Sequence, residues 1–288
     1  MSGKLLLKII LFIFFAFPAA STGQNLKIMT FNIRFDNPND GENVWDNRKS
    51  ELTGMVNYYQ PLFLGIQEGL ANQLDYMKAN LPNYDMIGAG REDGKRKGEY
   101  SAIFFDSTEY EKVNEKTFWL SEEDDKVSKG WDAALERICT YGLFREKKSR
   151  KLFNVFNTHF DHVGKEARIN SAKLILKKME ECTNDSSVVI LMGDFNSFPQ
   201  SEAIQIISAK LNDAFKASKK ALYGPEGTFN AFDKDLCISD RIDYIFVKNL
   251  DVISCRHIDD KRKNGGFLSD HLPVLIEVKR NDCKTTVH

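Results

Sequence analysis

Short apolar runs that favour strands alternate with segments of helical spacing along most of this chain, and this alternation restricts the fold more than any other feature. Strands are predicted at residues 26–33, 62–67, 100–105, 152–158, 188–192, 241–247 and 272–278. Helices are predicted at residues 52–59, 74–81 and 172–179, where apolar side chains recur every three or four positions. Because buried strands need helices to cover their faces, we expect a layered α/β domain.

The first 21 residues do not follow this pattern. Lys4 and Lys8 flank the start of an apolar stretch that runs without interruption through residues 9–17, and small residues follow Pro18. This order predicts a secretory signal peptide at residues 1–21 and a secreted or periplasmic protein. An uncleaved membrane anchor is the alternative, but the stretch is shorter than the roughly 20 residues that span a bilayer.

The remaining chain has no internal repeat and no long linker, so residues 25–280 are expected to form one domain, with residues 281–288 as a C-terminal tail. Hydrophobic residues make up 42% of the chain and charged residues 28%, which excludes a disordered chain and a multi-span membrane protein. The formal net charge of -1 argues against a protein that coats nucleic acid. Nothing predicts an obligate protein partner, and a monomer is expected.

The cysteines do not suggest a zinc site or a disulfide framework. No two of them have the CxxC spacing, and their number is odd: Cys139, Cys182, Cys237, Cys255 and Cys283. Two alternatives stay open, one disulfide bond or buried free thiols.

Polar side chains follow or end several of the predicted strands. They lie in residues 30–33, 65–68, 157–162, 193–196 and 269–271, and more weakly in residues 241–244. Each segment alone could be an ordinary turn, but three of the five histidines fall within them. Oxygen ligands with few cysteines favour magnesium, manganese or calcium over zinc. Together the segments predict a divalent-metal hydrolase with a site built around histidine.

The order and spacing of these segments resemble the endonuclease/exonuclease/phosphatase superfamily, a deoxyribonuclease-like group of metal-dependent phosphoesterases. The resemblance covers residues 26–278, and its most specific parts are Gln-Glu at 67–68, Gly-Asp-Phe-Asn at 193–196 and Ser-Asp-His at 269–271. Residues 30–48 and 118–122 further resemble a secreted bacterial branch of that superfamily. The resemblance implies a four-layer α/β sandwich, in which two packed mixed β-sheets are flanked by helices.

The resemblance also implies a metal site. Glu68 resembles the main metal-ligating carboxylate, and Asn32 resembles the amide that helps to hold the metal or its water. Asp270 resembles a second carboxylate of the metal or its water shell. Arg34 departs from one nuclease branch, in which an acid can stand at this position. The implied ion is Mg²⁺ or Mn²⁺, with Ca²⁺ as a further candidate.

Five further residues resemble the catalytic group of the superfamily. Asp194 and Asn196 resemble the pair that orients the attacking water and contacts the phosphate. His271 resembles the imidazole that contacts the scissile phosphate, with Asp243 holding it in orientation. His159 resembles a second histidine of the site. A divalent ion lowers the pKa of bound water, a carboxylate takes the proton, and an imidazole either stabilises the added transition-state charge or protonates the leaving oxygen. Which histidine is the acid is left open.

Three residues are weaker candidates for contacts with the substrate. Arg48 and Arg137 could each clamp a phosphate, and a structural or solvated arginine is the equal alternative. Alternation in an extended segment predicts that Asp161 points to the same side as His159, with His162 pointing away. The basic runs at residues 91–97 and 261–263 are either substrate-facing loops or solvated surface.

The sequence thus predicts a divalent-metal-dependent hydrolase of phosphate esters, with a phosphodiesterase favoured. The substrate class stays open among nucleic acid, a phospholipid headgroup and an inositol or sugar phosphate. The alternative from another class is a catalytically silent binding protein on the same scaffold. Completeness of the polar set distinguishes the two, and all eight residues assigned to the metal and to catalysis are present.

Overall fold

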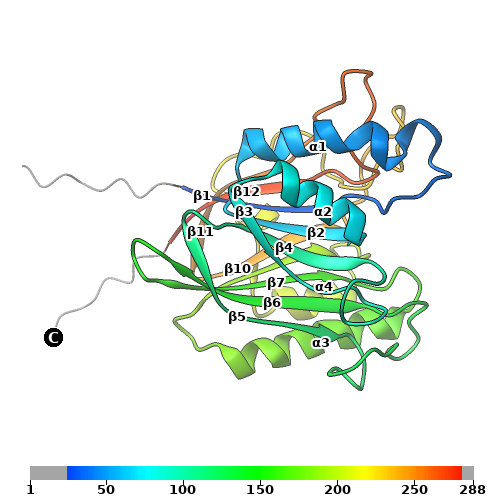
Figure 1. Ribbon diagram of the computed structural model, residues 1–288. Helices are drawn as coiled ribbons and strands as arrows, with labels where there is room; N and C mark the ends of the chain where they lie inside the picture. Colours follow the sequence, from blue (N-terminus) through cyan, green and yellow to red (C-terminus); the bar gives the residue numbers. More distant parts are fainter. Residues whose placement is uncertain (1–24, 281–288) are drawn as a thin grey trace, which may run out of the picture.

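The computed structural model describes residues 25–280. The predicted signal peptide at 1–21 and the predicted tail at 281–288 lie outside the described residues. Two six-stranded sheets pack face to face, and helices cover their outer faces (Figure 1). Within the described range no helix is both long and apolar enough to cross a membrane.

The first sheet has the strand order β11-β12-β1-β2-β4-β3. Its strands are β1 (Leu26–Asn32), β2 (Phe63–Gly69), β3 (Tyr84–Ile87), β4 (Tyr100–Asp106), β11 (Leu250–His257) and β12 (Val274–Arg280). The central strands β1 and β2 are parallel, whereas the other pairs are antiparallel. The sheet is therefore mixed, as expected.

The second sheet has the order β5-β6-β7-β8-β10-β9. Its strands are β5 (Tyr110–Trp119), β6 (Ile138–Glu146), β7 (Leu152–His159), β8 (Val188–Asp194), β9 (Asn212–Asp213) and β10 (Asp243–Lys248). Again one central pair, β7 and β8, is parallel, and the other pairs are antiparallel.

Helices complete the outer layers. The first sheet is covered by α1 (Trp45–Tyr59) and α2 (Ala71–Asn80), and the second by α3 (Lys165–Cys182) and α4 (Glu202–Ser208). The short elements η1 (Gly41–Asn43) and α5 (Ala214–Ala217) lie in connections. One apolar cluster fills the space between the sheets, and two others fill the spaces under the helices. This arrangement confirms the predicted four-layer sandwich.

The pairing of the strands brings distant polar residues to one end of the molecule. Asn32 ends β1 beside β2, and His159 ends β7 opposite Asp194 at the end of β8. The ends of parallel strands meet at the same edge of a sheet. Strand β10 runs antiparallel to β8 and begins with Asp243 directly opposite Asp194. The last segment of the site, residues 269–271, leads into β12, which pairs with β1.

A buried polar contact also joins the two sheets close to this end. Gln67 donates a hydrogen bond of 2.6 Å to the side-chain oxygen of Asn157. The side-chain amide of Asn157 in turn donates to the carbonyls of Ile66 and Ala102, at 2.9 and 2.7 Å. Buried polar groups of this kind have few alternative partners, so the contact determines how the strand ends of the two sheets face each other.

The four described cysteines are free thiols. Cys139 and Cys255 are buried, whereas Cys182 and Cys237 are exposed. Cys283 lies outside the described residues. Among the described residues the structure therefore corresponds to the free-thiol alternative.

Candidate active site

Asp194 lies at the centre of the polar cluster. One carboxylate oxygen, Oδ2, accepts a 3.0 Å hydrogen bond from the amide of Asn32. The same oxygen lies 3.5 Å from Nε2 of His159 and 3.8 Å from Nε2 of His271. Burial and the negative charge of Asp243 together raise the pKa of Asp194 to about 7, against the lowering effect of the positive charge of His271. The carboxylate is thus able to exchange a proton near neutral pH.

Asn32 connects Asp194 to Glu68. Its side-chain nitrogen donates to Oε1 of Glu68 at 3.0 Å as well as to Asp194. Its side-chain oxygen accepts the backbone N–H of Arg34, which identifies the two ends of the amide. Glu68 accepts a second hydrogen bond, from the backbone N–H of Phe35. The amide nitrogen of Asn32 therefore faces the carboxylates, and Asn32 holds two acidic side chains in place.

His271 is oriented by a carboxylate. Its Nδ1 lies 2.8 Å from Oδ2 of Asp243, so Nδ1 carries the proton of this hydrogen bond and Nε2 faces Asp194. The backbone N–H of Asp243 donates to the hydroxyl of Thr228. Burial alone would lower the pKa of His271, but the charges of Asp243 and Asp194 outweigh it and raise that pKa well above its usual value.

His159 has the opposite environment. The side-chain amide of Asn196 donates to Nε2 of His159 at 3.1 Å and to the carbonyl of Phe160 at 3.0 Å. Since the amide nitrogen is the donor in both contacts, Nε2 of His159 accepts and carries no proton. Burial lowers the pKa of His159 well below its usual value, and the positive charges of Arg137 and Arg91 lower it further.

Carboxylates crowd this end of the molecule and could hold a cation. Ligand atoms of Asp194, Asp243 and His271 lie within 4.8 Å of one another. Oδ1 of Asp243 is buried without a hydrogen-bond partner among the described residues. Burial raises the pKa of Asp270, and the charge of Glu68 raises it further. A divalent cation would relieve this repulsion, so the residues present fit a metal centre.

Two ligand sets are compatible with the site. The sequence predicts Glu68, Asn32 and Asp270, whereas the possible ligand atoms that lie within 4.8 Å of one another belong to Asp194, Asp243 and His271. We favour the side of Glu68 and Asp270, because the hydrogen bond between Asp243 and His271 already uses one atom of each. The assignments of Glu68, Asp270 and Asn32 stay predictions.

Arg48 is a structural residue next to the site, and its side chain is not accessible to a substrate. Its side chain is fully buried. It donates to the backbone carbonyls of Asn43, Ile33 and Leu268 at 2.6, 2.9 and 2.7 Å. These bonds tie the start of α1 to the end of β1 and to the loop before Asp270. The structure therefore corresponds to the structural alternative for Arg48 and corrects the expectation of a phosphate clamp.

Asp161 is likewise occupied by the protein itself. One oxygen accepts the backbone N–H groups of Val163 and Gly164, and the other lies 3.3 Å from Nε of Arg137. Asp161 is buried, and its contacts position Arg137 and leave no carboxylate oxygen free for a substrate. His162 is half exposed, and its Nδ1 lies 2.9 Å from Nη2 of Arg137.

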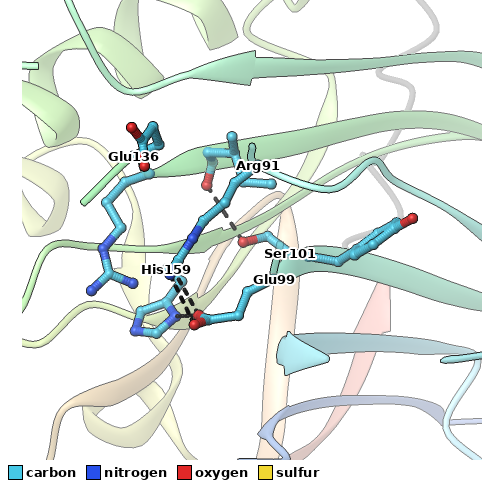
Figure 2. Close-up of a pocket in the computed structure, with 8 residues that line it drawn as sticks. Arg91, Glu99, Ser101, Glu136 and His159 are labelled. Carbon is cyan, nitrogen blue, oxygen red and sulfur yellow. Dashed lines mark hydrogen bonds and ion pairs between the residues drawn. The ribbon is translucent and has the colours of Figure 1, made fainter. Parts of the chain in front are cut away.

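A narrow polar pocket beside His159 contains Glu99, which sequence reasoning missed, and Arg91, the first residue of the basic run that was expected to be either a substrate-facing loop or solvated surface. Glu99 and Arg91 form a bidentate ion pair at 2.8 and 2.9 Å, and Figure 2 shows this pair next to His159. Arg137 lines the same pocket, and Oε2 of Glu99 lies 3.9 Å from Nδ1 of His159. Burial raises the pKa of Glu99 to about 7. A charged residue placed directly before the apolar strand β4 was the signal that could have identified Glu99.

Comparison with known proteins places this geometry among phosphoesterases. A family model described as "Endonuclease/Exonuclease/phosphatase family" matches residues 29–271. An endonuclease/exonuclease/phosphatase from Bacteroides vulgatus is 38% identical, with a TM-score of 0.85 over 89% of this chain and 99% of that chain. A mannosyl-6-phosphatase of Bacteroides thetaiotaomicron is also 38% identical, with a TM-score of 0.85 over 88% of this chain and 99% of that chain. Protein L388 of Acanthamoeba polyphaga mimivirus, described as uncharacterized, is 29% identical over 81% of this chain and 91% of its own.

Proposed function

The chain belongs to the endonuclease/exonuclease/phosphatase family, and we propose that it removes the phosphate group from phosphorylated sugars with the help of a divalent metal ion. Its assignment as a phosphoric ester hydrolase follows from the family and its structural neighbours. The observation that carries the proposed chemistry is a single buried carboxylate, Asp194, flanked by Nε2 of two histidines that differ in protonation.

The site supports a division of labour between its residues. Asp194 is positioned to orient the attacking water and accept its proton. His271 is the imidazole whose Nε2 is free to carry a proton toward the substrate, because its Nδ1 is bonded to Asp243. We propose His271 as the group that stabilises the added negative charge or protonates the leaving oxygen. His159 presents an unprotonated Nε2 that Asn196 holds in place.

The metal would bind on the carboxylate side of the cluster. We propose Glu68 and Asp270 as its principal ligands and Mg²⁺ or Mn²⁺ as the ion. When bound, such an ion neutralises phosphate charge and lowers the pKa of its water. Asn32 keeps Glu68 and Asp194 at a constant separation through its two donated hydrogen bonds.

Phosphorylated sugars are proposed as substrates on the basis of one neighbour. The mannosyl-6-phosphatase shares 38% identity with nearly the whole described chain. The near-neutral charge of the protein, with 40 basic and 41 acidic residues, agrees with a small substrate better than with a long polyanion.

Hydrolysis assays test the proposal. We expect the protein with Mg²⁺ or Mn²⁺ to release phosphate from mannose 6-phosphate and from p-nitrophenyl phosphate, and to lose this activity in EDTA. Asp194→Ala and His271→Ala should each lower kcat roughly 10²- to 10⁴-fold in a folded protein. Preferential cleavage of bis(p-nitrophenyl) phosphate would instead support the phosphodiesterase predicted from sequence. Activity on none of these esters would favour the silent binding protein.

We also propose that the protein is exported and that residues 1–21 are removed. The support is the order of basic, apolar and small residues at the N-terminus. Fractionation of the producing cells, followed by N-terminal sequencing, should recover a shortened chain outside the cytoplasm. A full-length chain in the membrane fraction would contradict the proposal.

A further inference from the structure

We propose that the pocket formed by Arg91, Glu99 and Arg137, a space of about 10 Å³, binds one hydroxyl group of the sugar that carries the phosphate. This inference rests on the proposed function, because it names the part of the substrate that lies beyond the phosphate. The pocket adjoins the catalytic cluster through His159, whose Nε2 faces Asp194 while its Nδ1 faces Glu99 (Figure 2). A group bonded to a phosphate held at Asp194 therefore has the pocket within reach.

Two buried donors in the pocket have no acceptor. Arg91 and Arg137 are only 8% and 4% exposed. Nε of Arg91 and Nη1 of Arg137 are buried and have no hydrogen-bond partner among the described residues. An unpaired buried donor is costly, so two of them beside an active site indicate that a ligand supplies the acceptors.

The balance of charges in the pocket distinguishes hydroxyl groups from a second phosphate. The two guanidinium groups are accompanied by two carboxyl groups, those of Glu99 and Glu136. A phosphate oxygen only accepts hydrogen bonds and would be repelled by the carboxylates. A hydroxyl group both donates and accepts, so it can bond an arginine and a carboxylate at once. The mixed lining therefore favours a hydroxyl group over a phosphate oxygen, and the space admits one such group.

The pocket is held in place by neighbouring elements and not by its own side chains alone. The backbone carbonyl of Arg91 accepts a 2.8 Å hydrogen bond from the indole of Trp119 in β5. The backbone N–H of Arg91 donates to the carbonyl of Glu99. Asp161 and His162 hold Arg137 from the opposite side. A change in the Arg91 side chain therefore leaves the loop anchored.

Comparing two substrates with one enzyme tests the inference. Mannose 6-phosphate has ring hydroxyls, whereas p-nitrophenyl phosphate has the same phosphate without them. We expect Arg91→Met to lower kcat/KM for mannose 6-phosphate roughly 10- to 100-fold more than for p-nitrophenyl phosphate. Glu99→Gln should show the same selectivity. Arg96→Met is the matched control, since this arginine of the same loop is exposed and pairs with Asp75; both activities should be unchanged.

Equal losses on the two substrates, or no loss on either, would overturn the inference while leaving the phosphatase function intact. The inference is also overturned, with the phosphatase function intact, if the unchanged protein hydrolyses p-nitrophenyl phosphate but not mannose 6-phosphate. If neither ester is hydrolysed, the proposed function fails, and calorimetry with free mannose decides the pocket separately. If the unchanged protein binds mannose and Arg91→Met abolishes this binding, the assignment of the pocket to the sugar is supported. If the unchanged protein does not bind mannose, the assignment is overturned.

Discussion

At the scale of single residues, the two histidines of the site differ because their hydrogen-bond partners differ. A carboxylate accepts from His271, whereas an amide donates to His159. The first contact stabilises a protonated ring, and the second requires a neutral one. Two chemically identical side chains are thereby given opposite protonation states by Asp243 and Asn196.

The pairing of Asp243 with His271 leads to a prediction for catalysis. Asp243→Asn keeps the shape of the side chain but removes the charge that stabilises the protonated ring. We expect kcat on p-nitrophenyl phosphate with Mn²⁺ to fall roughly 10²- to 10⁴-fold, while circular dichroism shows an intact fold. Asp185→Asn, at an exposed aspartate, is the control. A kcat equal to that of the unchanged protein would contradict this role of Asp243.

Arg48 leads to a prediction for stability. Arg48→Met leaves the carbonyls of Asn43, Ile33 and Leu268 without their buried donors. We expect urea unfolding to show a loss of about 3 kcal/mol or more in the free energy of unfolding. The KM of the folded fraction should stay close to its usual value. If the free energy of unfolding is unchanged and KM is raised, Arg48 contacts the substrate and this structural role is contradicted.

At the scale of elements, the end of β8 is built around a close backbone approach. Gly193 has φ +148°, and a Cβ atom there would lie 2.0 Å from the carbonyl oxygen of Thr158 in the neighbouring β7. Only glycine allows β7 and β8 to stay this close at the residue before Asp194. The position of the central carboxylate thus depends on the absence of a side chain next to it.

Gly193→Ala is therefore expected to move the strand end. We expect a loss of about 2–4 kcal/mol in the free energy of unfolding, together with lower kcat, because Asp194 is displaced. Gly54→Ala is the matched control in α1, where a Cβ atom meets nothing within 4 Å. It should stabilise the protein by about 0.5–1 kcal/mol. Equal effects of both substitutions in thermal unfolding would rule out the proposed crowding.

The strands and helices predicted from sequence all contribute side chains to the core. Each predicted strand and helix is present, with strand boundaries that shift by up to two residues, whereas α1 and α3 begin seven residues earlier than predicted. The elements not predicted include β5, whose residues 111–117 are largely exposed and strongly charged. An edge strand with both faces near water lacks the apolar alternation that reveals other strands. Strand β6 was also missed, although most of its residues are buried.

At the scale of the whole molecule, a buried histidine outside the proposed catalytic group links stability to pH. His257 stacks on Phe215, and its Nδ1 donates to the carbonyl of Pro225 at 3.0 Å. Burial lowers the pKa of His257 from 6.5 to about 4, against the raising effect of the bond to Pro225. As pH falls from about 6.5 to about 4, the imidazole of His257 becomes protonated in the unfolded chain but stays neutral in the folded chain.

The free energy of unfolding should therefore decrease over this range by up to about 3 kcal/mol from His257 alone. Asp194 and Glu99, whose pKa values are raised to about 7, oppose this trend because the folded chain binds their protons first. The measurement is consequently a comparison: urea unfolding of the protein and of His257→Gln at several pH values between 4 and 7. The difference between their free energies of unfolding should shrink toward pH 4, and a difference that is constant with pH would contradict the prediction.

The amino-acid sequence by itself determined the layered α/β architecture, the family and the set of polar residues at the strand ends. These properties are local, because strand patterns and short motifs depend only on residues that are close together in the sequence. The tertiary structure alone decided the partners of those residues. Asn32 meets Asp194 across 162 positions of the chain, and the bidentate pair of Arg91 with Glu99 becomes part of the site only through its contact with His159. Protonation, burial and hydrogen bonding depend on such distant contacts, and no local pattern encodes them.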